Sequence, residues 1–234
     1  MNSIVFNGVA IETVAPVKID DVRISPIQYS PVVRPRAIQF GSDFVRMRGG
    51  ERTITVSFAL QIENRIERRA ALDALSEWAR SDAEYEMQIA DNPGKILYCV
   101  CTQKPDPSVR QWWENKLRFV FVCFNNPYWT DNAEKSVACG TQFNVCGDAP
   151  PLMRIERTLS GAASNQSYSD GTNTMTFSTI PAGSMVIDLN RQTAAVGSTS
   201  IMQYYAPAGA FIPAKTGVQT ITGTGTIKYR ERWE

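Results

Sequence analysis

Residues 52–60 carry the most regular hydrophobic pattern in the chain. Apolar side chains occupy every second position, and they are Ile54, Val56, Phe58 and Leu60. Because successive side chains of a strand point to opposite faces, this pattern predicts a β-strand with one buried face. Residues 117–124 are apolar on both faces after the first positions, which predicts a strand that is central in its sheet or covered by another element on each side.

Between these segments the apolar residues recur every three to four positions, which is the spacing of a helix. The pattern predicts a helix from about Arg65 to Arg80, with Asn64 as its cap and Glu67 completing a capping box. The apolar stripe consists of Ala71, Leu72, Leu75, Trp78 and Ala79. Burial of this stripe would hold the helix against a sheet.

A β-hairpin is predicted just before the strand at 52–60. Its two extended runs are 34–40 and 44–48, and Gly41-Ser42-Asp43 is the expected three-residue turn. Apolar residues fall on both faces, because the second run does not alternate cleanly. One chain can cover one face with its own core, so we expect a partner subunit on the other. The candidate interface residues are Ile38, Phe40, Phe44, Arg46 and Arg48.

The chain changes character near Pro127-Tyr128-Trp129. Sixteen Lys and Arg and fifteen Asp and Glu precede this point, whereas eight of each follow it, among many Thr, Ser, Gly and Ala. We therefore expect two domains, 1–129 and 130–234. The first is predicted to be an α+β sandwich with one helix and a protruding hairpin.

The second domain shows short strand patterns separated by turn signals. The expected strands are 152–158, 174–180, 184–190, 200–205, 217–222 and 225–233. Such spacing is typical of a β-sandwich or jelly roll, so the whole chain is predicted to be mainly β. The polar stretch 160–173 is expected to be an exposed loop.

The composition excludes several kinds of chemistry. The 234 residues include no histidine, so Ser-His-Asp and Cys-His catalysis and His-ligated zinc or haem are excluded. A formal net charge of +1 argues against a dedicated DNA or membrane-surface binder. The N-terminus lacks the features of a signal peptide, and no stretch of about 18 apolar residues is present, so a soluble protein is expected. No cofactor and no metal are predicted.

The five cysteines give little support for a disulfide framework. Their number is odd and their spacing scattered, so we expect reduced thiols made in a cytosol. A bridge between Cys139 and Cys146 stays open as an alternative.

Three polar or aromatic groupings allow other functions. Asp82, Glu84 and Glu86 alternate after the helix and are candidates for a glycosidase carboxylate pair, although a solvated edge explains them as well. The pairs Asp20-Asp21 and Asp131-Asn132 could bind calcium, but no EF-hand spacing is present.

The aromatic pairs Trp112-Trp113 and Tyr204-Tyr205 could stack on sugars, or belong to core and interface. A basic cluster surrounds the hairpin, and its members could meet a neighbour's carboxylates, solvent or DNA; they are Arg34, Arg36, Arg46, Arg48 and Arg52.

The order of these signals resembles the distal tail protein (Dit) family of phages with long non-contractile tails. The resemblance is carried by segments spread over residues 1–129, and only strand spacing extends it over 130–234. These segments are Phe6-Asn7-Gly8, Ile24-Ser25-Pro26-Ile27, the Gly41-Ser42-Asp43 turn, 52–58, the helix ending in Leu75-Ser76-Glu77-Trp78, 97–100 and the exit 121–129, which closes with Asn126-Pro127-Tyr128-Trp129.

The resemblance implies a structural virion protein at the phage tail tip and not an enzyme. The first domain would build a hexameric ring that continues the tail tube, with its hairpin embracing the next subunit. The second domain would be a peripheral, galectin-like β-sandwich. Implied partners are the tail tube protein, tail-tip hub or tape-measure proteins and receptor-binding proteins, with DNA only in passage. The protein would be made in the host cytoplasm, and a carbohydrate-binding module remains the first alternative.

Overall fold

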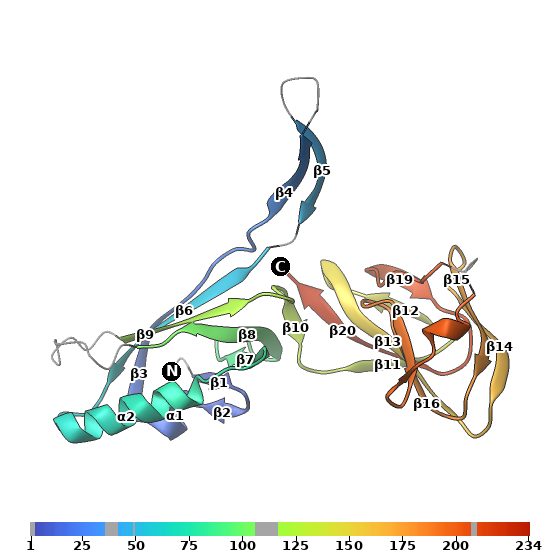
Figure 1. The fold of residues 1–234 in the computed structure, drawn as a ribbon. Coiled ribbons are helices and arrows are strands. Elements are labelled where there is room, and N and C mark those ends of the chain that lie inside the picture. The colour runs from blue at the N-terminus through green and yellow to red at the C-terminus, as the bar shows by residue number, and fades with distance from the viewer. Residues whose placement is uncertain (1–2, 36–41, 49, 106–116, 207–209) are drawn as a thin grey trace. The chain divides into compact units, whose positions relative to one another are not determined.

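The chain folds into two compact units that are both built mainly from strands. A computed structural model describes residues 3–35, 42–48, 50–105, 117–206 and 210–234. Unit 1 comprises residues 1–129 with Glu234, and unit 2 comprises residues 130–233. The predicted mainly-β fold class is confirmed (Figure 1).

Unit 1 is one antiparallel sheet that folds around a core, with a helix against it. Its strands pair in the order β3-β6-β9-β8-β7-β1-β2, and a separate pair is formed by β4 and β5. The elements are β1 (Ile4–Phe6), β2 (Val9–Ala10), α1 (Ile11–Val14), β3 (Val17–Ile24), β4 (Ser30–Pro35), β5 (Ser42–Arg48), β6 (Arg52–Leu60), α2 (Arg65–Trp78), β7 (Tyr85–Ile89), β8 (Lys95–Gln103) and β9 (Leu117–Cys123). The first half of β8 pairs with β7 and its second half with β9, so this strand turns the sheet from one layer to the other.

The two strands predicted from alternation form the centre of this sheet. In β6 the residues Ile54, Val56 and Phe58 are at most 1% exposed, as the two-residue period predicts. Strand β9 pairs with β6 on one side and β8 on the other, which confirms its predicted central position.

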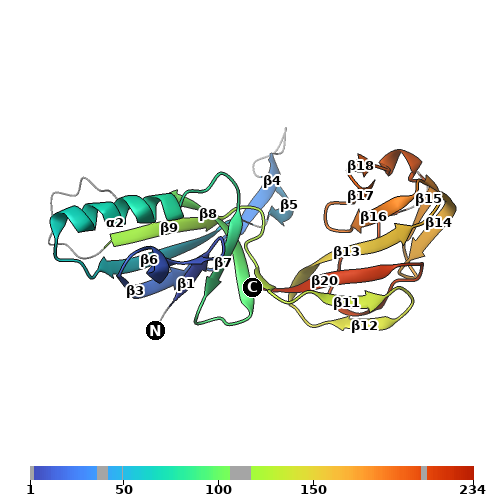
Figure 2. The ribbon, with the colours of Figure 1, turned by 90° about the horizontal axis from the view of Figure 1, so that it is seen from below.

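Helix α2 packs on the sheet through the predicted apolar stripe. The side chain of Asn64 accepts the backbone N–H of Ile66 at 2.9 Å, and its amide donates to Glu67, so the predicted cap is present. At the other end, the Trp78 ring meets Phe119 of β9 at 5.6 Å between centroids. Figures 1 and 2 show the helix running along one face of the sheet.

Unit 2 has a principal sheet with the order β18-β17-β16-β13-β20-β11 and two further pairs, β12-β19 and β14-β15. Strand β10 (Trp129–Asp131) lies at the boundary of the units. The remaining elements are β11 (Lys135–Ala138), β12 (Gln142–Val145), β13 (Ala149–Leu159), β14 (Ala163–Ser169), β15 (Thr174–Ile180), β16 (Gly183–Asp188), β17 (Thr193–Val196), β18 (Thr199–Ser200), the 3-10 turn η1 (Met202–Tyr204), β19 (Gly217–Thr220) and β20 (Thr226–Trp233).

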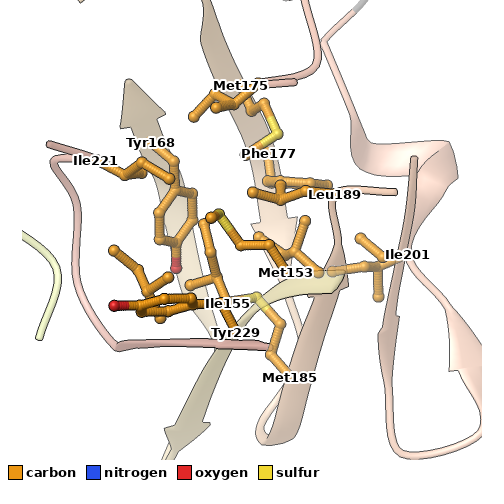
Figure 3. Close-up of a cluster of buried hydrophobic side chains, with 14 of the residues drawn as sticks. Met153, Ile155, Tyr168, Met175, Phe177, Met185, Leu189, Ile201, Ile221 and Tyr229 are labelled. Carbon is orange, nitrogen blue, oxygen red and sulfur yellow. The ribbon is translucent and has the colours of Figure 1, made fainter. Parts of the chain in front are cut away.

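The core of unit 2 lies between these layers. Figure 3 shows Tyr168 of β14 and Phe177 of β15 packed with Met153 of β13 and Tyr229 of β20. The Tyr168 hydroxyl donates to the Thr224 carbonyl at 3.0 Å, which satisfies its polar end inside the core.

Two sequence expectations in unit 2 are wrong. The predicted loop at 160–173 contains β14, which pairs with β15 along its length. This strand has a polar outer face and buries mainly Tyr168, so no apolar alternation marks it. The predicted strand at 200–205 is the end of β18 followed by η1, because Ile201 enters the core and the chain turns there.

Strand β20 places a carboxylate on its buried face, as its sequence pattern indicates. Glu231 is 2% exposed and lies on the same face as Ile227 and Tyr229. Its carboxylate accepts from the Lys135 ammonium at 2.8 Å and from the Cys146 backbone N–H at 3.0 Å. Burial favours a higher pKa for Glu231, but these two donors outweigh it and hold the pKa below its usual value.

Candidate subunit interface

The predicted hairpin exists as a two-stranded arm, which we define as β4 and β5. It continues the ribbon of β3 and β6: the backbone N–H of Ser25 donates to the Thr53 carbonyl, and that of Gln28 donates to the Glu51 carbonyl. Beyond these bonds, Ser30 of β4 pairs with Arg48 of β5. The arm is therefore the outer half of one long nested hairpin.

The two chain segments where the arm begins, which we call its root, contain Gln28 and Gly50, and their close approach depends on the glycine. A Cβ built on Gly50 would overlap the carbonyl oxygen of Gln28, so only a residue without a side chain fits here. Nearby, the Ser25 hydroxyl accepts the Thr53 backbone N–H at 2.9 Å, and Ile27 is 9% exposed. These contacts fix the two chain segments where the arm begins.

Both outer edges of the arm lack a strand partner among the residues that the structure describes. Strands β4 and β5 pair with each other and with no other described strand. In Figure 1 they leave unit 1 at the end of the β3-β6 ribbon. A two-stranded ribbon is marginally stable in water by itself, so a surface that covered the arm would stabilise it.

The arm has a different register from the one predicted. The expected turn at Gly41-Ser42-Asp43 is wrong in part, because Ser42 and Asp43 belong to β5 and pair with Pro35 and Arg34. The first strand is correspondingly earlier, at Ser30–Pro35. Gly41 is a common turn signal and led to the later position, whereas β4 contains Pro31 and Pro35, which edge strands accept.

The predicted interface residues divide between the described and undescribed parts of the chain. Phe44, Arg46 and Arg48 lie in β5, whereas Ile38 and Phe40 lie outside the described residues. The register shifts between Val32 and Val33, which leaves Val45 as an extra residue in β5. This bulge is the physical reason why the apolar residues of the second run do not alternate.

The arginines of the basic cluster predicted around the hairpin divide among three parts of the chain. Arg34, Arg46 and Arg48 lie in the arm strands, while Arg36 lies outside the described residues. Arg52 begins β6, and its side chain is buried, at 4% exposed.

The three alternating carboxylates each have local partners. Glu84 accepts the backbone N–H groups of Phe124 and Asn125, both at 2.8 Å. Glu86 accepts the Tyr98 hydroxyl at 3.1 Å. Asp82 accepts the Tyr85 hydroxyl, and this bond lowers the pKa of Asp82. These contacts favour a structural role over that of a glycosidase pair.

The aromatic pairs do not form an open sugar platform in the described residues. The Tyr205 ring packs against Phe177 at 5.6 Å and Phe211 at 5.1 Å between centroids, which fits a core role. Tyr204 lies in η1 and is half-buried, and Trp112-Trp113 lies outside the described residues.

Within the described parts of the chain, the cysteines and acidic residues do not cluster into a metal site. All five cysteines are free, and no cluster of three or more candidate metal ligands occurs within the described ranges. Cys139 and Cys146 are therefore not bridged.

The hydrogen bond with Cys123 and burial raise the pKa of Cys99, and burial raises that of Cys101 to about 11, so both thiols stay protonated near neutral pH. The acidic pair at 20–21 has a local partner, since Asp21 pairs with Arg23 at 2.6 Å.

Two residues that fix backbone conformation were not predicted from the sequence: Gly50, where the arm begins, and Glu84, which binds the turn after β9. Gly50 acts through a contact with Gln28, and the Gly49-Gly50 pair was the available signal for it. Glu84 acts on residues 40 and 41 positions away, and no local pattern indicates such a contact.

No helix among the described residues is long and apolar enough to cross a membrane.

Comparison by sequence finds no relative, whereas comparison by structure finds phage tail proteins. No protein-family model matches the chain, and no curated protein matches it. The structure is similar to the crystal structure of the Dit protein of phage SPP1, described as a paradigm of the hub adsorption apparatus in phages that infect Gram-positive bacteria. The similarity covers 100% of both chains with a TM-score of 0.75 at 15% identity.

Two further similar structures come from the phage p2 baseplate in its activated conformation. One covers 98% of this chain and 97% of the other, with a TM-score of 0.50 and 9% identity. The second, with calcium, covers 100% and 98% with a TM-score of 0.51 and 6% identity. The fold expected from the resemblance to distal tail proteins is thus confirmed over both units.

Proposed function

We propose that the chain is a distal tail protein, a structural component of the phage tail tip that works without catalysis or a cofactor. The observation that carries this proposal is the fold shared with SPP1 Dit over the full length of both chains. The likeness to p2 baseplate chains supports the same role. The protein would be made in the cytoplasm of the bacterial host and reside in the virion.

In this proposal six copies form a ring that joins the tail tube to the tip complex and leaves a channel for DNA. Unit 1 would form the ring, and unit 2 would lie at its periphery. The partners would be the tail tube protein on one face and hub or tape-measure proteins on the other, with receptor-binding proteins further out. Identical copies joined by one repeated head-to-tail contact close into a ring when the rotation allows it.

The arm supplies a physical reason for such a contact. Its strands have unpaired outer edges in the described structure, and its arginines suit a neighbour's carboxylates through bidentate hydrogen bonds. A channel lining that gripped phosphates tightly would slow the passage of DNA, so these arginines are assigned to the interface between subunits.

Substitution of Phe44 by Asp tests this assignment. An unpaired charge in an apolar contact is costly, so Phe44→Asp should raise the concentration at which the oligomer dissociates by at least about tenfold. The monomer should stay folded, because Phe44 lies in the arm and outside the sheet of unit 1. Mass photometry gives the oligomer, and circular dichroism gives the fold.

Phe124→Asp is the matched control, because it makes the same substitution at a phenylalanine of unit 1 that is 46% exposed and lies outside the arm. The control should assemble like the unmodified protein. If Phe44→Asp assembles equally well, the arm is not the subunit contact.

A further inference from the structure

A groove of about 690 Å³ lies in unit 1 beside the end of α2. One wall is the turn between β1 and β2, with Asn7 and Val9. The other is the end of α2 with Ala74 and Trp78, followed by the segment that leads to Tyr85.

The groove joins two of the sequence segments that carried the resemblance and that the proposed function does not use. They are Phe6-Asn7-Gly8 and Leu75-Ser76-Glu77-Trp78. Asn7 and Gly8 have positive φ angles of 50° and 76°, which form a tight turn. The Trp78 indole N–H donates to the Val9 carbonyl at 3.0 Å and ties the walls together. The groove is therefore formed before any partner binds.

Its lining combines apolar surface with carboxylates. Val9 is 45% exposed, and the half-buried Trp78 and Tyr85 add aromatic surface. Glu77 and Asp82 contribute two negative charges, and Arg80, which pairs with Glu77 at 3.3 Å, contributes one positive charge. Aromatic faces beside carboxylates are suited to guanidinium groups that alternate with apolar side chains.

We propose that this groove receives the arm of a second copy of the chain. Strands β4 and β5 contain three arginines, Arg34, Arg46 and Arg48, and a single acidic residue, Asp43, and the run 44–48 reads Phe-Val-Arg-Met-Arg. The arm is thus cationic in a chain whose total formal charge is +1, and its apolar residues match the rest of the groove. This inference rests on the proposed ring and names the surface that receives each arm.

The arm of a chain points away from the groove of that same chain. Figure 1 shows β4 and β5 rising from the sheet of unit 1 away from α2, and Figure 2, seen from below, has α2 in front and the arm behind. Arm and groove are therefore two different patches of one chain. A contact between them in two copies is head-to-tail, which is the kind that closes a ring.

Charge reversal on each side tests the pairing. The groove variant carries Glu77→Arg and Asp82→Arg, the arm variant carries Arg46→Glu and Arg48→Glu, and a third variant combines all four. Each single-sided variant should raise the dissociation concentration of the oligomer by about tenfold or more in mass photometry, and the combined variant should recover most of that loss.

Glu63→Arg with Asp91→Arg is the matched control, because both residues are exposed carboxylates of unit 1 that do not line the groove. This control should assemble like the unmodified protein, and circular dichroism should show every variant folded. A groove variant that assembles normally, or a combined variant no better than the single-sided ones, overturns the groove assignment alone. An unmodified protein that stays monomeric at all concentrations overturns the proposed ring itself.

Discussion

Glu84 determines the conformation of the turn that follows β9. Its carboxylate accepts two backbone N–H groups and, at 3.0 Å, the side-chain amide of Asn125. Glu84→Ala should lower the free energy of unfolding by about 1–3 kcal/mol, because the turn loses a charged acceptor for several donors. Urea denaturation measures this difference. Glu63→Ala, which removes an exposed carboxylate, should change the value by less than about 0.5 kcal/mol, and equal effects would contradict the assigned role.

Asp170 makes the stability of unit 2 depend on pH. Its side chain is 1% exposed, and burial favours a higher pKa. The backbone N–H groups of Asn173 and Thr172 and the Lys215 ammonium outweigh burial and lower the pKa to about 2. A lowered pKa means that the folded state favours the charged form. The stabilisation is therefore complete above the unfolded pKa of about 4 and is lost as the pH falls towards 2.

Asp170→Asn keeps an oxygen for the two backbone donors but removes the charge. At pH 7 the variant should be less stable than the unmodified protein by up to about 2 kcal/mol, and this difference should shrink between pH 4 and pH 2. Urea denaturation at several pH values measures it. A difference that stays constant over this range would show that the charge of Asp170 is not its cause.

At the residue scale, local contacts were predictable and distant ones were not. The cap at Asn64 acts on a residue two positions ahead, so its sequence pattern is sufficient to find it. The roles of Glu84 and Gly50 depend on chain segments that only the folded structure brings together.

Gly50 allows the two chain segments at the start of the arm to lie close together. A side chain at this position would collide with the backbone of Gln28, and backbone cannot move aside as a flexible side chain can. Gly50→Ala should shift the root and cost about 1–3 kcal/mol of local stability, which hydrogen exchange would report as faster exchange in β3, β4 and β5. Gly161→Ala is the control, because a Cβ at Gly161 meets nothing within 4 Å. Unchanged exchange in Gly50→Ala would show that the root tolerates a side chain.

Elements with a strong hydrophobic period were predictable, and polar or irregular ones were not. Strands β6 and β20 and helix α2 follow their periods. Strand β14 was missed because its outward face is made of Ser, Asn and Gln, which are also the residues of loops. The register of the arm was misplaced because a bulge in β5 interrupts the alternation that sets register.

At the scale of the whole molecule, the mainly-β class followed from many short strands and regular turn signals. The resemblance that pointed to distal tail proteins had no support from sequence comparison, yet the fold matches over the full chain. Two chains can share a fold at 15% identity because packing restricts hydrophobicity more than it restricts residue identity. The proposed ring could not be derived from one chain, since its contacts would lie between copies.

Mass measurement of the purified protein over a range of concentrations, combined with electron-microscope images of the same sample, tests the central proposal most directly. We expect particles of six copies with an open centre, which dissociate when the arm is altered. A single 26.0 kDa species at every concentration would contradict it.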